Sequence, residues 1–190
     1  MDASLGKELK KVLARDLGFK FYLSHNVESI TNDGKQIELI AKSSTQELLT
    51  LKGDYCLVAI GRKAYTEGLN LNKIGVVVSS SGQVEVNKNL QTSHSHIYAI
   101  GDVVNGPMLA HKSEEEGVFV AEVIAGQKPE FNHNLIPNVV YTWPEVASVG
   151  QTEEQLKELG MDFKIGIFPF KANGRAKISM DTDGFVKIIA

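Results

Sequence analysis

The sequence predicts an α/β protein, and three features of its middle part predict this class. Residues 55–61 form a continuous apolar run, as expected of a strand buried on both faces of a parallel sheet. A second apolar run, residues 97–100, ends at Gly101 and Asp102. A helical pattern then covers residues 109–125, and Gly126 closes it. The middle of the chain is therefore predicted to be strand, glycine-rich loop and helix.

The composition is that of an ordinary globular protein. Of 190 residues, 43% are hydrophobic and 23% are charged, which is enough apolar material for a core. The formal net charge of -3 offers no electrostatic case for binding nucleic acid. The single cysteine, Cys56, cannot form an internal disulfide, and we expect an inert core thiol. With no signal segment and no membrane span in the sequence, we expect a cytoplasmic protein.

The first third of the chain is predicted to be a helix followed by short antiparallel strands. Apolar residues at helical spacing indicate a helix over residues 4–17 that Gly18 ends. Three lysines of this helix are expected on a solvated face, although a basic binding patch is the alternative: Lys7, Lys10 and Lys11. Strands are expected at residues 19–22, 27–30, 36–41 and 47–51, with a turn at Asn32-Asp33-Gly34. Residues 62–93 are predicted to be irregular.

The last part of the chain changes character near Pro137. Residues 152–155 form a capping-box pattern that predicts a short helix ended by Gly160. Strands are expected at residues 163–170, 176–180 and 185–190, with a hairpin turn at Asp183-Gly184. The chain begins with a helix and stops inside an apparent strand, so we expect both ends to be cut.

The clearest candidate site is Asp102 with the helix start near Leu109. A carboxylate just after a buried strand lies at the edge where open α/β folds bind ligands. Asp102 could accept hydrogen bonds from sugar hydroxyls, and the free N–H groups of the helix start suit a phosphate or a ring carbonyl. The alternative is that Asp102 only caps a turn. Gly61 ends the first apolar run, where a glycine lets the backbone approach a ligand.

Other polar residues carry weaker signals. Glu114, Glu115 and Glu116 are expected on a solvated helix face rather than at a metal, since adjacent helix positions point in different directions. His111 is expected to be a polar contact or a cap rather than a base. His94 and His96 are a weak metal signal. Motifs for dinucleotide loops, P-loops, serine hydrolases and C-x-x-C redox sites do not occur.

Three segments resemble the dihydrolipoamide dehydrogenases, which are flavoprotein pyridine nucleotide-disulfide oxidoreductases. Residues 92–126 resemble their second flavin-binding motif, and residues 108–117, MLAHKSEEEG, are its most specific part. Residues 55–62, YCLVAIGR, resemble the end of the NAD domain. Residues 136–150, IPNVVYTWPEVASVG, resemble the entry to the dimerisation domain. The resemblance covers essentially the whole chain and favours this family over glutathione reductase, mercuric reductase or soluble transhydrogenase.

The resemblance implies a fold of partial FAD/NAD(P)-binding Rossmann-like domains plus the start of an α+β dimerisation domain. Residues 1–73 would be the C-terminal part of the NAD domain, 74–136 the returning half of the FAD domain, and 137–190 the start of the dimerisation domain. The implied cofactors are FAD and NAD. The implied partners are a second copy, in a homodimer, and the lipoyl domains of 2-oxo acid dehydrogenase complexes.

The resemblance also implies cofactor-binding residues. Asp102 would bond the ribityl chain of FAD, Gly101 would be a further cofactor-binding residue, and Gly61 would lie against NAD. Four residues would line the flavin, with backbone N–H groups aimed at the pyrimidine edge of its ring: Met108, Leu109, Ala110 and His111.

The family's redox cysteine pair, its glycine-rich loops and its catalytic His-Glu pair have no counterpart in this sequence. We therefore expect no catalytic residue here, an internal fragment that is inactive alone, and weak FAD binding. Two alternatives stay open: a soluble transhydrogenase or other flavoprotein disulfide reductase, and a non-catalytic fragment that self-associates through residues 137–190.

Overall fold

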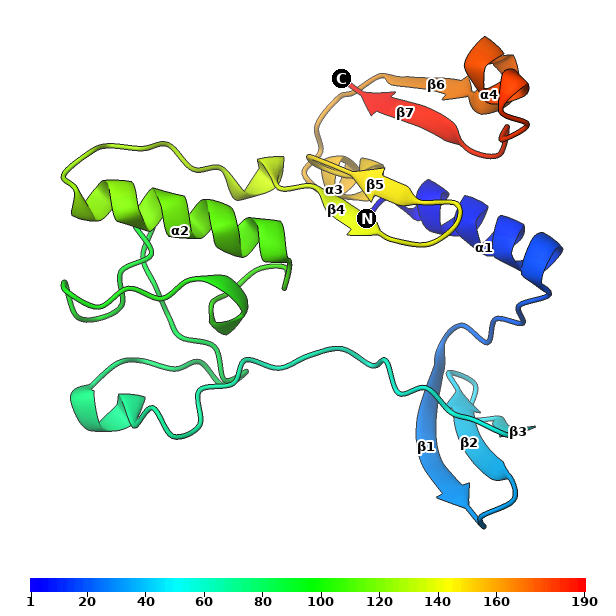
Figure 1. Cartoon of the computed structure of the whole chain (residues 1–190), viewed down its shortest axis with the longest axis horizontal. Coiled ribbons are helices and arrows are strands. Elements are labelled where there is room, and N and C mark those ends of the chain that lie inside the picture. Colours follow the sequence, from blue (N-terminus) through cyan, green and yellow to red (C-terminus); the bar gives the residue numbers. More distant parts are fainter. The chain divides into compact units, whose positions relative to one another are not determined.

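The computed structural model describes all residues, 1–190, and divides them into two compact units (Figure 1). The first unit comprises Met1–Ile60, Val140–Val146 and Thr152–Ala190, and the second comprises Gly61–Val139 and Ala147–Gln151. The chain contains both helices and strands, as the predicted α/β class requires. The helices are α1 (Ala3–Leu17), α2 (Ala110–Ile124), α3 (Glu153–Glu158) and α4 (Gly174–Ile178). None of them is both long enough and apolar enough to cross a membrane.

Helix α1 confirms the predicted N-terminal helix, including both of its ends. The carboxylate of Asp2 accepts a hydrogen bond from the N–H of Ser4 (3.0 Å) and caps the helix. Gly18 ends it in the left-handed conformation, with φ of 68°. Val12 and Leu13 are buried, whereas Leu17 is exposed, so the apolar face of the helix is only partly covered.

The predicted strand pair around the Asn32-Asp33-Gly34 turn is also confirmed. Strands β1 (His25–Asn32), β2 (Ile37–Ser43) and β3 (Leu48–Gly53) form an antiparallel meander in the order β1-β2-β3, drawn in blue and cyan in Figure 1. Side chains of the turn fix it: Asn32 accepts from the N–H of Gly34, and Asp33 accepts from the N–H groups of Lys35 and Gln36 (all 2.8 Å).

The predicted strand at residues 19–22 is wrong. The structure has no strand there, because these residues pair with no neighbouring strand. The N–H of Phe19 instead bonds to the carbonyl of Leu13 (3.3 Å) and helps to close α1.

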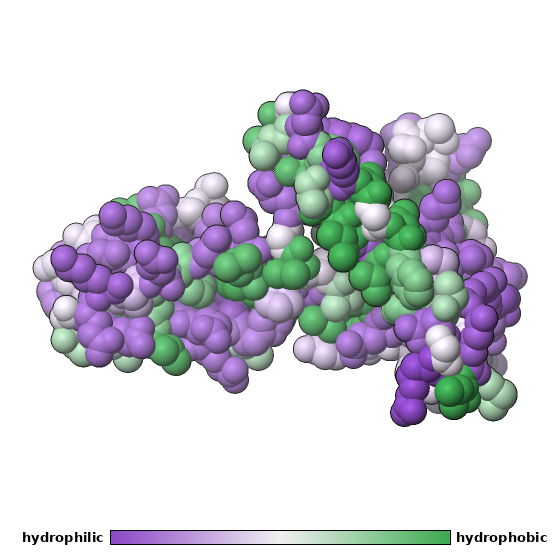
Figure 2. Space-filling model, turned by 90° about the horizontal axis from the view of Figure 1, so that it is seen from above, coloured by the Kyte–Doolittle hydropathy of each residue, from purple (hydrophilic) through white to green (hydrophobic).

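The predicted buried strand at residues 55–61 is wrong as well. The segment takes part in no backbone hydrogen bond, and Tyr55, Leu57 and Ile60 are each at least 90% exposed. A parallel strand needs neighbours on its edges and helices on its faces, and nothing in the described chain supplies them to this segment. Apolar residues consequently reach the surface among hydrophilic ones, as Figure 2 shows. Cys56 is half-buried in this segment and is not the predicted core thiol.

The second predicted strand, residues 97–100, forms only an isolated bridge between Tyr98 and Gln91. Its backbone groups bond to residues shortly before it in the chain. The N–H of Thr92 donates to the carbonyl of Ile97 (2.9 Å), and the N–H of Ala99 donates to the carbonyl of Leu90 (3.1 Å). These pairings are local, and residues 97–100 do not form the predicted buried strand.

Helix α2 confirms the helix predicted over residues 109–125, and Gly126 follows it with φ of 80°. The helix buries Phe119 and Val120 against Leu90, which gives the second unit its apolar cluster. The ring of Phe131 packs on Phe119 with centroids 5.6 Å apart. In Figure 1 the irregular segment that precedes α2 lies beside it.

The C-terminal part mixes confirmed and wrong predictions. The capping box of Thr152 and Gln155 starts α3, and Gly160 follows it with φ of 65°. The two short strands β4 (Asn138–Val140) and β5 (Val146–Ser148) precede this helix, and β6 (Ile165–Pro169) pairs antiparallel with β7 (Phe185–Ile189). The strand predicted at residues 176–180 is instead α4, because Asn173 caps a helix by accepting from the N–H of Ala176 (3.0 Å).

A charged cluster ties the ends of this unit together. The ammonium of Lys187 lies 2.9 Å from a carboxylate oxygen of Asp2 and 2.6 Å from one of Glu153, with Asp2 and Lys187 almost fully buried. Burial alone would raise the pKa of Asp2, but hydrogen bonds from Ser4 and Lys187 outweigh it and hold the pKa well below its usual range. Arg15 pairs similarly with Asp183 (2.6 Å) at the turn before β7.

Candidate functional site

The candidate site lies where the chain turns from residue 100 into helix α2. Gly101 is buried, has a φ of 74°, and starts a short 3₁₀ turn over Gly101–Val103. A Cβ atom on Gly101 would lie 3.0 Å from Oγ of Ser113, so the backbone comes close to α2 here. The next residue, Asp102, keeps its side chain 41% exposed and thus available to a ligand.

The N-terminus of α2 has no side-chain cap. Leu109 is the N-cap residue and is extended, with φ of -126° and ψ of 134°. The N–H groups of the first helical residues, Ala110 and His111 among them, have no partner within the helix. An uncapped helix start carries partial positive charge and free donors, which suit a phosphate or an electron-rich carbonyl.

Arg62 joins the two parts of this site. Its guanidinium lies 3.1 Å from the carboxylate of Asp102 and also donates to the carbonyl of Met108. Both charged side chains are substantially exposed, so this ion pair adds little to stability. Sequence reasoning named Arg62 only as the residue after Gly61 and did not connect it with Asp102.

The other predicted site residues are placed as follows. His111 donates from Nε2 to the carbonyl of Pro137 (2.7 Å), which is the polar contact expected of it. Gly61 has a φ of 109° and lies in open space, with no atom within 4 Å of a Cβ placed on it. The structure therefore brings together Gly101, Asp102 and residues 108–111. No other residues pack around Gly61.

The expectation of a solvated acidic face holds for Glu114 and Glu115 but is wrong for Glu116. Glu116 and Lys112 have no exposed side-chain surface, and their charged atoms are 3.0 Å apart. His133 donates from Nε2 to Oε1 of Glu116 (3.2 Å), the same carboxylate oxygen that lies nearest Lys112. Sequence reasoning considered only the three adjacent glutamates; the spacing of four residues between Lys112 and Glu116 was the signal for this pair.

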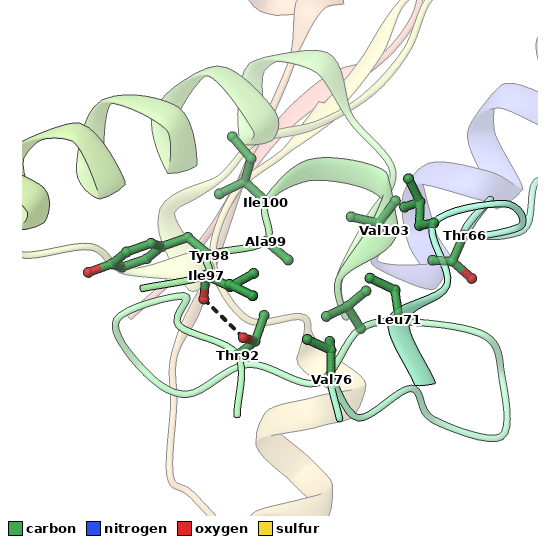
Figure 3. Close-up of a pocket in the computed structure, with 11 residues that line it drawn as sticks. Thr66, Leu71, Val76, Thr92, Ile97, Tyr98, Ala99, Ile100 and Val103 are labelled. Atoms are coloured by element: carbon green, nitrogen blue, oxygen red, sulfur yellow. Dashed lines mark hydrogen bonds between the residues drawn. The ribbon is translucent and has the colours of Figure 1, made fainter. Parts of the chain in front are cut away.

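An apolar cavity of about 250 Å³ lies beneath the same turn. Figure 3 shows Leu71 and Val76 along one side of it, and along another the residues of the following turn that line it: Ile97, Tyr98, Ala99, Ile100 and Val103. Thr92 uses its hydroxyl to donate to the carbonyl of Ile97 (3.0 Å), and the ring of Tyr98 points away from the other labelled side chains. Few polar groups converge on this cavity, so it lacks the pattern of a substrate site. No group of three or more His, Cys, Asp or Glu is arranged to hold a metal ion.

The comparisons with known families agree with the fold. Residues 1–117 match the model of the pyridine nucleotide-disulphide oxidoreductases. Residues 136–190 match the dimerisation domain of the pyridine nucleotide-disulphide oxidoreductases.

Similar proteins include mitochondrial dihydrolipoyl dehydrogenases. The chain is 46% identical to that of Mus musculus and 45% identical to that of Homo sapiens, over all of its own length and 37% of theirs. It is 46% identical to that of Pisum sativum, of which it covers 38%.

Similar solved structures cover the whole chain as well. The HOCl-induced flavoprotein disulfide reductase RclA of Escherichia coli gives a TM-score of 0.83 at 29% identity, with 42% of its own chain covered. LpdA of Mycobacterium tuberculosis gives 0.87 at 25% identity, with 40% of its chain covered. These matches confirm the predicted fold class, a partial Rossmann-like flavoprotein fold with the start of a dimerisation domain. The chain therefore belongs to the pyridine nucleotide-disulphide oxidoreductase family.

Proposed function

We propose that this chain is the flavin-holding part of an FAD-dependent dihydrolipoyl dehydrogenase. The observation that carries the proposal is the exposed carboxylate of Asp102 beside the uncapped N-terminus of α2. The identity of 44–46% to dihydrolipoyl dehydrogenases along all 190 residues supports the choice of enzyme. The whole protein would oxidise dihydrolipoyl groups through a redox disulfide and FAD to NAD+.

The residues present fit part of a flavin. Asp102 offers acceptors to the hydroxyls of the ribityl chain, and Gly101 lets the backbone turn there. The free N–H groups of Ala110 and His111 would donate to the pyrimidine edge of the ring, where they would stabilise negative charge. Met108 and Leu109 would line the flavin, and the N–H of Leu109 bonds to the carbonyl of Pro107 (3.1 Å). The adjacent Arg62 adds positive charge at the same place. Gly61 would lie against the nicotinamide cofactor, with its open surroundings leaving the backbone accessible.

Bound FAD would carry the electron pair from a dithiol to NAD+. The dithiol itself is not among residues 1–190, since Cys56 is the single cysteine. The role of this chain is accordingly to bind and orient the flavin, and we expect it to be inactive by itself. We keep residues 1–73, 74–136 and 137–190 as the proposed parts of the NAD, FAD and dimerisation domains.

We propose a homodimer that uses residues 137–190, with lipoyl domains of 2-oxo acid dehydrogenase complexes as the partners of the whole protein. The match of residues 136–190 to a dimerisation domain supports the homodimer. We also propose a cytoplasmic location. The similar dehydrogenases of mouse and pea are mitochondrial, so cell fractionation with a mitochondrial marker decides between the two compartments.

Equilibrium titration with FAD tests the flavin site. We expect quenching of flavin fluorescence with weak affinity, and loss of the colour on desalting. Asp102→Ala should weaken binding about tenfold, because a carboxylate that accepts hydrogen bonds is removed. Asp162→Ala, at an exposed aspartate without a side-chain partner, should bind as the unaltered chain does. Equal binding by the chain and by Asp102→Ala would count against the proposed site.

Two other functions have distinct signatures. Another flavoprotein disulfide reductase is favoured by the likeness to RclA at 29% identity. An assay of the longer protein with dihydrolipoamide and NAD+ distinguishes the two enzymes, since only the dihydrolipoyl dehydrogenase should reduce NAD+ with this substrate. A non-catalytic, self-associating role predicts association without flavin binding, which light scattering and the titration detect together.

A further inference from the structure

We propose that Lys112 and Glu116 are positioning residues that fix the turn carrying Asp102. The proposal rests on the proposed function, in which Asp102 binds the flavin. Both side chains are fully buried on α2, one helical turn apart, with their charged atoms 3.0 Å from each other. They touch the turn through its first residue, Gly101.

The side chains of Glu116 and Lys112 each form a hydrogen bond with the backbone of Gly101. Its N–H donates to Oε2 of Glu116 at 2.7 Å, and its carbonyl accepts from the ammonium of Lys112 at 3.1 Å. Gly101 is buried, and its N–H has no partner other than Glu116, since strand pairing is absent here. Its carbonyl also accepts from the N–H of Val104 (3.3 Å), so the ammonium of Lys112 adds a second hydrogen bond to that carbonyl. The pair thus sets the backbone immediately before Asp102.

Lys112 also holds the far end of the loop. Its stem lies against Gly106, where an added Cβ would come within 2.9 Å of Cε of Lys112. Gly106 has a φ of 124°, a conformation that side-chain-bearing residues rarely adopt. One lysine therefore contacts both Gly101 and Gly106, the two glycines that bracket Asp102.

His133 completes the cluster from a different segment. Its ring packs edge-on against Phe131, with centroids 4.5 Å apart, and Nε2 donates to Oε1 of Glu116. That contact occupies one carboxylate oxygen and leaves Oε2 toward Gly101. A buried ion pair is a weak source of stability because its charges lose their water. Its geometry is specific, however, and that specificity suits a positioning role.

Two double variants distinguish the effect of the hydrogen bond to Gly101 from the effect of the charges on Lys112 and Glu116. Lys112→Met with Glu116→Gln removes both charges but keeps an oxygen that can accept from the N–H of Gly101. Lys112→Met with Glu116→Leu removes that acceptor too. Glu115→Gln, at the exposed neighbouring glutamate, is the matched control for losing a carboxylate on the same helix. Two readouts are measured: FAD affinity by titration, and amide hydrogen exchange at Gly101 relative to Leu90 in the apolar cluster.

The Leu variant should speed exchange at Gly101 about tenfold relative to Leu90 and weaken FAD binding by a similar factor. The Gln variant, which loses the ammonium of Lys112 but keeps an acceptor for the N–H of Gly101, should lose clearly less than the Leu variant in both readouts. Glu115→Gln should stay near the unaltered chain. Unchanged exchange and affinity in the Leu variant would overturn the proposal. So would equal losses in the Gln and Leu variants.

Glu116→Asp provides a second route if the Leu variant does not fold. It keeps the charge but withdraws the carboxylate by one methylene, so faster exchange at Gly101 and weaker FAD binding are expected. Exchange at Gly101 as slow as in the unaltered chain would overturn the proposal. Amide hydrogen exchange at Gly101 can be measured without flavin. If the chain binds no FAD, the proposed function is refuted, but the exchange rates of the variants still decide whether Lys112 and Glu116 position the turn.

Discussion

Glu116 shows how different the surroundings of identical neighbouring residues can be. Glu114 and Glu115 are exposed, whereas Glu116 is fully buried and bonded to Lys112, Gly101 and His133. Successive helix positions point in different directions, so one of three adjacent carboxylates can face the protein while the others face water. The three glutamates by themselves give no sign of which one is buried; only Lys112, four residues before Glu116, singles out that carboxylate as a pairing partner.

Asp2 makes a testable contribution at the same scale. Asp2→Asn keeps a good helix cap but removes the charge beside Lys187. We expect the free energy of unfolding at pH 7 to fall by about 2 kcal/mol, as for other hydrogen bonds to charged groups. Urea denaturation at several pH values measures it.

The pH dependence distinguishes charge from capping. The folded-state pKa of Asp2 is lowered, so its charge stabilises the folded chain above the unfolded pKa of about 3.9, and this stabilisation is lost as the pH falls through the folded pKa. The difference between Asp2→Asn and the unaltered chain should therefore narrow below about pH 3.9. A difference that does not change with pH would assign the effect to capping or packing. Asp162→Asn, at an exposed site, is the control.

Helix α2 is the element on which the candidate site depends. Its first turn presents free N–H groups, and its first two turns bury Lys112 and Glu116 under the loop that carries Asp102. The helix is therefore held in place by the apolar cluster around Phe119 and, at the same time, holds the loop. This double role explains why the glycines of the loop cannot easily be replaced.

Gly106→Ala tests that packing. The new Cβ would meet Cε of Lys112 at 2.9 Å, at a φ of 124°. Gly126→Ala is the control, since Gly126 also has a positive φ, 80°, but open space around it. We expect Gly126→Ala to cost about 1–2 kcal/mol and Gly106→Ala clearly more, with weaker FAD binding only for Gly106→Ala. Thermal unfolding and FAD titration measure both; equal effects would mean that the contact with Lys112 does not matter.

At the scale of the whole chain, the exposed apolar run at residues 55–60 stands out. Its backbone is unpaired, and Tyr55, Leu57 and Ile60 are almost fully exposed. An unpaired apolar segment readily pairs with another chain. The chain thus has two places for association, this run and the proposed dimerisation part at residues 137–190.

The double variant Leu57→Lys, Ile60→Lys distinguishes association through residues 55–60 from association through residues 137–190. If residues 55–60 drive association, the apparent mass of this double variant, measured by light scattering, should no longer rise with protein concentration. A discrete species of twice the 20.8 kDa chain mass should remain if residues 137–190 form the dimer. Ile124→Lys, at an exposed apolar residue outside both segments, controls for added charge. Concentration-dependent growth that persists in the double variant would refute the role of the run.

Sequence by itself determined the local features of this protein. The limits of α1, α2 and α3, the turn at Asn32-Asp33-Gly34 and the family motif around Asp102 were all readable, because caps, turns and helical hydrogen bonds involve residues close along the chain. Only the tertiary structure decided whether residues 55–61 and 97–100 form strands, and that Lys112 and Glu116 are buried. A strand depends on a partner brought from elsewhere in space, and burial depends on what packs over a side chain, so neither is specified by the segment itself.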